Sequence, residues 1–183
     1  IPTKKLKNGF EMPVFGIGTW RIGGHTTPDP NNDDQADIQS IKRAIDNGIT
    51  HIDTAELYGN GHSEELVGEA IKGIERKKLF ITTKVWSTHL SHDGVINACK
   101  NSLKRLGLSY VDLYLIHWPN PLFSMEKSMK AMDYLVDNKM TRHIGVSNFF
   151  VSQMEKAQKF AKHKIVTNQV EYHLLNRRRE KEL

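Results

Sequence analysis

The sequence has little that would anchor it in a membrane or cross-link it. It contains one cysteine, Cys99, so an intrachain disulfide is excluded and a reducing, cytoplasmic setting is expected. No apolar run approaches the ~20 residues that a membrane-spanning helix needs, and the opening residues, IPTKKLKNGF, lack the apolar core of a secretion signal. These absences exclude a disulfide-rich scaffold and predict a protein without a membrane partner.

Charged residues are abundant but are not gathered into one large patch. They make up 26% of the chain, with a formal net charge of +5, beside 38% hydrophobic residues, which is typical of a globular protein. The densest run, RRREK at residues 177–181, is interpreted as the solvated start of a helix. No aromatic residues alternate with it, as a stacking platform for nucleic acid would require, so no nucleic-acid partner is expected.

Short runs of β-branched and aromatic residues alternate with segments in which apolar residues recur at helical spacing. The helical segments cover residues 38–45, 66–74, 95–106 and 125–135. Ser63 is predicted to cap the second helix, and a fifth helix is predicted to open at SQME, where Ser152 and Glu155 form a capping-box pattern. The predicted strands are residues 14–20, 50–55, 79–86, 110–118, 141–148 and 164–173.

Before this alternation, residues 1–14 form a unit of their own. Asn8 and Gly9 stand between alternating residues, which predicts a type I′ hairpin that caps the barrel described next. Strands that alternate with helices imply a parallel sheet, either an open doubly wound sheet or a (β/α)8 TIM barrel. Polar residues at the strand ends favour the barrel, whose active sites lie there. These residues are Asp53, Lys84, His117, Asn148, Gln169 and His173.

A barrel of this type needs eight strands and about 250 residues. The 183 residues supply only six strand–helix units. We therefore expect residues 1–183 to form a single partial TIM-barrel domain and to be the front part of a longer protein.

Asp53 stands in a stretch, THIDTA, that otherwise has the pattern of a buried strand. An unpaired buried carboxylate costs roughly several kcal/mol, so a cationic partner is expected. Neighbouring parallel strands are ~4.8 Å apart, and Lys84 near the end of the next strand is the predicted partner. A nearby ammonium also stabilises the phenolate form of a tyrosine, and Tyr58 follows Asp53 on a loop. With His117 across the cavity, the set suits a tyrosine acid that protonates a carbonyl oxygen as hydride reaches its carbon.

The same residue types are compatible with other functions. Asp53 and Lys84 alone could be a structural ion pair, and GIGTWRIGG does not have the spacing of the dinucleotide fingerprint. A metal-dependent TIM-barrel hydrolase is the rival from a different class. Its ligands would come from His51, Asp53, Lys84, His117 and His173. Stoichiometric zinc in the purified protein would decide for the hydrolase.

The sequence resembles the aldo-keto reductases from the hairpin to its last residue. The matching segments, in the family's order and spacing, are GIGTW, HIDTAELYGN, ITTKVW, VDLYLIHWP, IGVSNF and NQVEYH. The resemblance implies a (β/α)8 barrel that binds NADPH, with NADH as the alternative, without a Rossmann fold. It also implies reduction of aldehyde or ketone carbonyls to alcohols, with hydride from the nicotinamide and the proton from Tyr58.

The family's functional residues fall on matching positions of this sequence. The catalytic positions are Asp53, Tyr58, Lys84 and His117. The cofactor positions are Thr19, Trp20, Asp53, Ser147, Asn148 and Gln169, and the substrate-pocket positions are Trp20, Trp86 and His117. No role is assigned to Glu56 or Asn60.

The departures from the family concern its last third. The aromatic residue that stacks on the nicotinamide, the basic segment that grips the 2′-phosphate and the C-terminal substrate loop have no counterpart in residues 1–183. A molecule that ended at Leu183 is therefore expected to bind cofactor poorly and to turn over little. A non-catalytic, reductase-like binding or regulatory module is the alternative. The natural substrate, the choice between NADPH and NADH, and the oligomeric state are left open.

Overall fold

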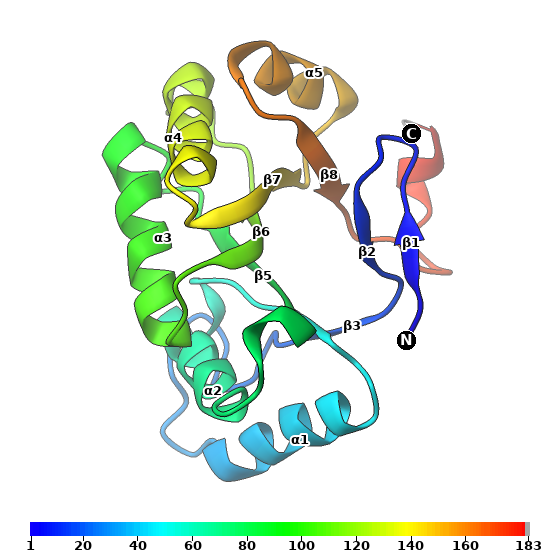
Figure 1. Ribbon diagram of the computed structural model, residues 1–183. Helices are drawn as coiled ribbons and strands as arrows, with labels where there is room; N and C mark the ends of the chain where they lie inside the picture. The colour runs from blue at the N-terminus through cyan, green and yellow to red at the C-terminus, as the bar shows by residue number, and fades with distance from the viewer. Residues whose placement is uncertain (182–183) are drawn as a thin grey trace.

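Six strands pair in parallel, each with the next one along the chain, and form a single curled sheet (Figure 1). The computed structural model describes residues 1–181. The strands are β3 (Gly16–Gly18), β4 (His51–Asp53), β5 (Phe80–Val85), β6 (Val111–Ile116), β7 (Thr141–Ser147) and β8 (Ile165–Gln169). All six strands predicted from the sequence are present, and the arrangement confirms the fold class, a part of a (β/α)8 barrel.

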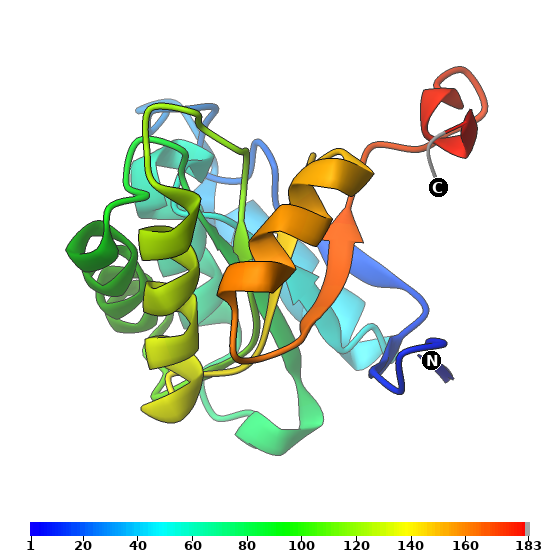
Figure 2. The same ribbon diagram turned by 90° about the horizontal axis from the view of Figure 1, so that it is seen from above.

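The connections between consecutive strands are helical, and the helices lie outside the curl of the sheet (Figure 1; turned by 90° in Figure 2). The α-helices are α1 (Asp34–Asp46), α2 (His62–Ala70), α3 (His92–Leu106), α4 (Met125–Asp137) and α5 (Val151–Phe160). Short 3₁₀ segments are η1 (Tyr58–Gly61), η2 (Arg76–Lys78) and η3 (Arg178–Lys181). Within residues 1–181, no helix is both long and apolar enough to cross a bilayer.

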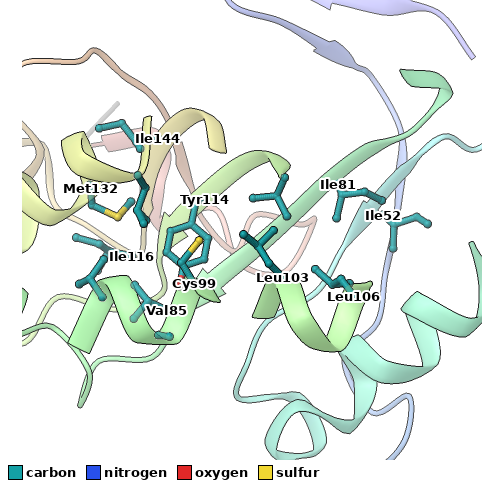
Figure 3. Close-up of a cluster of buried hydrophobic side chains, with 14 of the residues drawn as sticks. Ile52, Ile81, Val85, Cys99, Leu103, Leu106, Tyr114, Ile116, Met132 and Ile144 are labelled. Atoms are coloured by element: carbon teal, nitrogen blue, oxygen red, sulfur yellow. The ribbon is translucent and has the colours of Figure 1, made fainter. Parts of the chain in front are cut away.

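The main hydrophobic core lies between the outer face of the sheet and the helices (Figure 3). Alternate residues of each strand, such as Ile52 of β4 and Ile81 of β5, meet side chains of the helices, among them Leu103 and Met132. The other residues of each strand face the inside of the curl. This alternation places Asp53 and Lys84 on the inner face.

The N-terminal hairpin covers one end of that inner face. Strands β1 (Thr3–Lys5) and β2 (Glu11–Pro13) pair antiparallel, beside β8 in Figure 1. Phe10 packs with Leu113, Leu115 and Val166 in a second buried cluster, and the Asn8 amide donates to the Val166 carbonyl (2.7 Å). The carboxyl ends of the strands remain open for a site.

Three details of the chain's local structure differ from the sequence predictions. The hairpin turn is not type I′, because Gly9 has a positive φ (+88°) and Asn8 does not. The Leu6 carbonyl accepts the Gly9 N–H (2.9 Å), which makes a three-residue loop ending in a left-handed glycine. The type I′ prediction fails because the strands are joined by three residues, 7–9, and not by the two residues of a type I′ turn.

The predicted caps of α2 and α5 are also wrong. Ser63 lies inside α2, after the N-cap Gly61, and its hydroxyl is buried against Thr19. Helix α5 begins two residues earlier than the SQME pattern indicates, with Gln153 accepting the N–H of the N-cap Phe150 (2.9 Å).

Candidate active site

The polar strand-end residues meet at one edge because the strands are parallel. This edge, formed by the carboxyl ends of the strands, is called the rim. Asp53 is the last residue of β4, Ser147 of β7 and Gln169 of β8, while His117 directly follows β6. In the pairing of β4 with β5, Asp53 lies opposite Thr82, so Lys84 points to the same face two residues further toward the rim.

Lys84 forms the centre of the site. Its side chain is 1% exposed, and its ammonium donates to the carboxylate of Asp53 and to the Thr54 carbonyl (2.9 Å). The hydroxyl of Tyr58 lies 3.5 Å from Nζ. An ammonium has three N–H groups, and these contacts use all three. The predicted partnership of Asp53 and Lys84 is therefore present.

The carboxylate of Asp53 also reaches across the mouth of the sheet. One oxygen accepts from Lys84 of the neighbouring strand, and the other accepts from the amide of Gln169 at the end of β8. The side chain is only 15% exposed. Asp53 therefore ties β4 to both β5 and β8 at the rim.

Tyr58 is held over the rim by a tight backbone turn. Its N–H donates to the Ala55 carbonyl (3.0 Å), and the next three residues, Gly59, Asn60 and Gly61, all have positive φ. Such a left-handed run favours glycine, which explains the GNG of the motif. The ring of Trp20 packs edge-on against Tyr58, with centroids 4.9 Å apart.

His117 is a buried, neutral imidazole. Burial, reinforced by the positive charge of Lys84, lowers the pKa of His117 to about 4. Its Nδ1 is buried without a hydrogen-bond partner within residues 1–181. Its ring lies edge-on to both Tyr58 and Trp86, with centroids 5.7 Å and 5.3 Å away.

Three polar side chains stand beside His117 at the ends of β7 and β8. Asn148, in a left-handed conformation (φ +62°), donates through Nδ2 to the His117 carbonyl (3.1 Å) and to Ser147 Oγ (3.0 Å). The Gln169 amide donates to Asp53. Within residues 1–181, these bonds leave Asn148 Oδ1, Gln169 Oε1 and the Ser147 O–H for a ligand.

Several of these side chains, but not those of Asp53 and Lys84, line an open cavity of about 550 Å³ at the rim. Its walls are Trp20, Leu57, Tyr58, Trp86, His117, Trp118, Ser147, Asn148, Gln169, Val170 and Glu171. Sequence reasoning missed Leu57, Trp118, Val170 and Glu171, although each lies within two residues of a named position. Thr19 does not line the cavity; it is fully buried, and its hydroxyl accepts from Ser63 (2.8 Å).

The residues of the metal hypothesis do not form one cluster. His51 is buried beneath the rim, with Nε2 3.0 Å from Thr82 Oγ1, whereas His173 is exposed and contacts Glu171. Among the described residues, no three His, Cys, Asp or Glu side chains are placed to hold a metal ion. A larger hollow of about 850 Å³ lies among α1, α2 and α3, but none of the strand-end residues lines it.

Comparisons with known proteins agree on one family. Residues 14–183 match the model of the aldo/keto reductase family. Glyoxal reductase of Bacillus subtilis is 43% identical over 173 residues, which are 93% of this chain and 58% of that protein.

Solved structures give the same result. A crystal structure of a thermostable aldo-keto reductase with the inhibitor epalrestat superposes with a TM-score of 0.95 at 47% identity, over 100% of this chain and 66% of that one. An aldo/keto reductase of Klebsiella pneumoniae with NADP and acetate gives 0.85 at 35% identity, over 99% and 62%. The chain thus spans less than two thirds of the length of each of these relatives.

Proposed function

Because the chain belongs to the aldo/keto reductase family, we propose that the protein reduces aldehyde or ketone carbonyls to alcohols with NADPH. Two relatives support the proposal: one is named a glyoxal reductase, and another was crystallised with NADP. We also propose that residues 1–183 act as one partial-barrel domain, with the hairpin of residues 1–14 as its cap.

The polar groups beside His117 fit the carboxamide of a nicotinamide. A carboxamide offers two N–H donors and one carbonyl acceptor. Asn148 Oδ1 and Gln169 Oε1 are the matching acceptors, and the Ser147 hydroxyl is the matching donor, since their other polar atoms already have partners. We propose that these three residues hold the nicotinamide, with Asp53 and Trp20 beside it and Thr19 supporting Trp20 from behind.

NADPH, when bound, supplies the hydride. Tyr58 donates its proton to the carbonyl oxygen, and the ammonium of Lys84, 3.5 Å from the hydroxyl, stabilises the phenolate that remains. Asp53 and the Thr54 carbonyl fix the ammonium in place.

His117 orients the carbonyl group. With its pKa lowered to about 4, the imidazole is neutral at pH 7 and carries one proton. Nδ1 is buried and out of a ligand's reach, which leaves Nε2 as the nitrogen that serves a ligand. We propose that Nε2–H donates to the substrate oxygen while the rings of Trp20 and Trp86 form the pocket walls.

The observation that carries the proposal is the contact of one buried ammonium with both a carboxylate and a phenol at the wall of a cavity. Its test is Tyr58→Phe in the full protein. We expect kcat to fall by ~100- to 10,000-fold, the contribution of a general acid, with NADPH affinity unchanged.

NADPH consumption with a panel of simple aldehydes gives the rate, and quenching of tryptophan fluorescence gives the affinity. Tyr134→Phe, at a tyrosine 40% exposed on α4, is the matched control and should behave as wild type. If Tyr58→Phe kept most of its activity, the role of Tyr58 would be refuted. Wild-type protein that bound NADPH but reduced no aldehyde would instead indicate the non-catalytic module.

A further inference from the structure

Glu56, between the catalytic positions Asp53 and Tyr58, has an unusually enclosed side chain for a loop carboxylate. The side chain is 9% exposed. Its Oε1 accepts the backbone N–H of Trp86 (2.6 Å) and faces Nδ1 of His89 (2.9 Å). The other oxygen, Oε2, takes part in neither contact. A loop glutamate that served only solubility would not be turned inward in this way.

The contact with Trp86 continues the ladder between β4 and β5 beyond the last paired residues. Past Asp53, the Thr54 N–H donates to the Thr82 carbonyl (2.9 Å) and the Glu56 N–H donates to the Lys84 carbonyl (3.3 Å). At the next step the chain turns away toward Tyr58. The Glu56 carboxylate then takes the place of the missing backbone carbonyl and accepts the Trp86 N–H.

Glu56 thereby fixes the segment that carries a wall of the cavity. The His89 N–H donates to the Trp86 carbonyl (3.0 Å) and closes a turn that begins at Trp86, the residue whose own N–H is held by Glu56. The Trp86 ring lines the cavity and packs edge-on against the His117 ring. A carboxylate bond to a backbone N–H is short and strong, as the 2.6 Å distance indicates.

We propose that Glu56 is a positioning residue, which acts through the Trp86 N–H to hold the indole against His117 and so fits the pocket to substrates that extend beyond the carbonyl. The inference rests on the proposed function. It predicts that Glu56 matters for a substrate whose ring reaches Trp86 and matters little for glyoxal, which has no such group.

The test compares four variants of the full protein with two probes, benzaldehyde and glyoxal. For Glu56→Ala we expect KM for benzaldehyde to rise about tenfold while kcat stays within about threefold, the pattern of lost binding rather than lost chemistry. KM for glyoxal should change by less than about threefold, which also shows that the variant is folded.

Three further variants separate the parts of the contact. Glu56→Gln keeps an acceptor at Oε1 and should restore KM for benzaldehyde to within about threefold. His89→Ala removes the exposed partner only and should leave KM unchanged. Glu126→Ala, which removes an exposed carboxylate on α4, is the control for the loss of charge.

Amide hydrogen exchange at the Trp86 N–H gives a readout independent of turnover. We expect slow exchange in wild type and Glu56→Gln, and fast exchange in Glu56→Ala. Active wild-type protein whose Glu56→Ala variant keeps both the benzaldehyde KM and slow exchange would overturn the role of Glu56. So would an equal rise of KM for both aldehydes, or a Glu56→Gln variant as impaired as Glu56→Ala. A wild type that reduced neither aldehyde would instead refute the proposed function.

Discussion

Replacing Lys84 by methionine should lower the free energy of unfolding as well as stop the reaction. The ammonium is almost fully buried, and its removal leaves the Asp53 carboxylate, 15% exposed, without a cation. Breaking a buried pair in this way costs ~3–5 kcal/mol. Because Gln169 still donates to Asp53, we expect a loss at the lower end, about 3 kcal/mol of unfolding free energy.

The double variant Lys84→Met/Asp53→Asn separates the lost pair from the uncompensated charge. Removing the carboxylate as well should recover at least ~1 kcal/mol of stability, because contacting residues show coupling of this size. It should recover no activity, since the ammonium beside Tyr58 is still missing.

Urea unfolding of each variant measures both effects. Lys72→Met is the matched control, because Lys72 is 70% exposed and its pair with Glu69 is expected to contribute less than ~1 kcal/mol. A Lys84→Met variant as stable as Lys72→Met would refute the reasoning. A double variant less stable than Lys84→Met alone would also refute it.

Two further predictions concern buried groups without a partner. Burial lowers the pKa of His117 from 6.5 in the unfolded chain to about 4, so the unfolded state binds more protons between these values and stability should fall as the pH drops through this window. Urea midpoints at pH 7 and pH 4.5 test this, and His117→Gln should show a smaller drop if His117 is responsible. The Tyr114 hydroxyl has no hydrogen-bond partner within residues 1–181, so Tyr114→Phe should raise the unfolding free energy by up to ~1 kcal/mol. Tyr110→Phe, which removes a hydroxyl bonded to Arg142, should not raise the unfolding free energy. Thermal melts of both variants measure the changes, and a lower melting temperature for Tyr114→Phe would refute the prediction.

The strands and the central ion pair could be predicted because both follow from short-range rules. β-branched runs set off by helical spacing mark the strands, and parallel strands bring their carboxyl ends to one edge. A lysine and an aspartate in apolar strands on that edge then have few alternatives to pairing, as Asp53 and Lys84 do.

Two of the three errors occur where a side chain makes a tertiary contact. Asn8 and Gly9 belong to a three-residue loop and not to a type I′ turn, and the Asn8 amide donates to the Val166 carbonyl of β8. Ser63 precedes a helical pattern like a cap, yet its hydroxyl is taken into the core by Thr19. Neither partner is near in sequence, so no local pattern reports it.

The proposed role of Glu56 could not be predicted from the sequence either. Its residue type and its place on a loop are ordinary, and nothing in HIDTAELYGN distinguishes it from a solvated glutamate. Its contact with the Trp86 N–H exists only because β4 ends before β5 does, which leaves one N–H of the ladder without a backbone acceptor.

The curl of the sheet itself is required by the site. Asp53 accepts from Lys84 on the next strand and from Gln169 on β8, which is 116 residues away in sequence and not a neighbour of β4 in the sheet. In a flat sheet the strands between them would separate the two side chains by several times the ~4.8 Å strand spacing. Because the sheet curls, one carboxylate can hold the ammonium beside Tyr58 and also contact Gln169, one of the side chains proposed to bind the nicotinamide. The proposed proton donor and the proposed cofactor contacts therefore depend on one side chain, and the contacts of that side chain depend on the curl of the sheet.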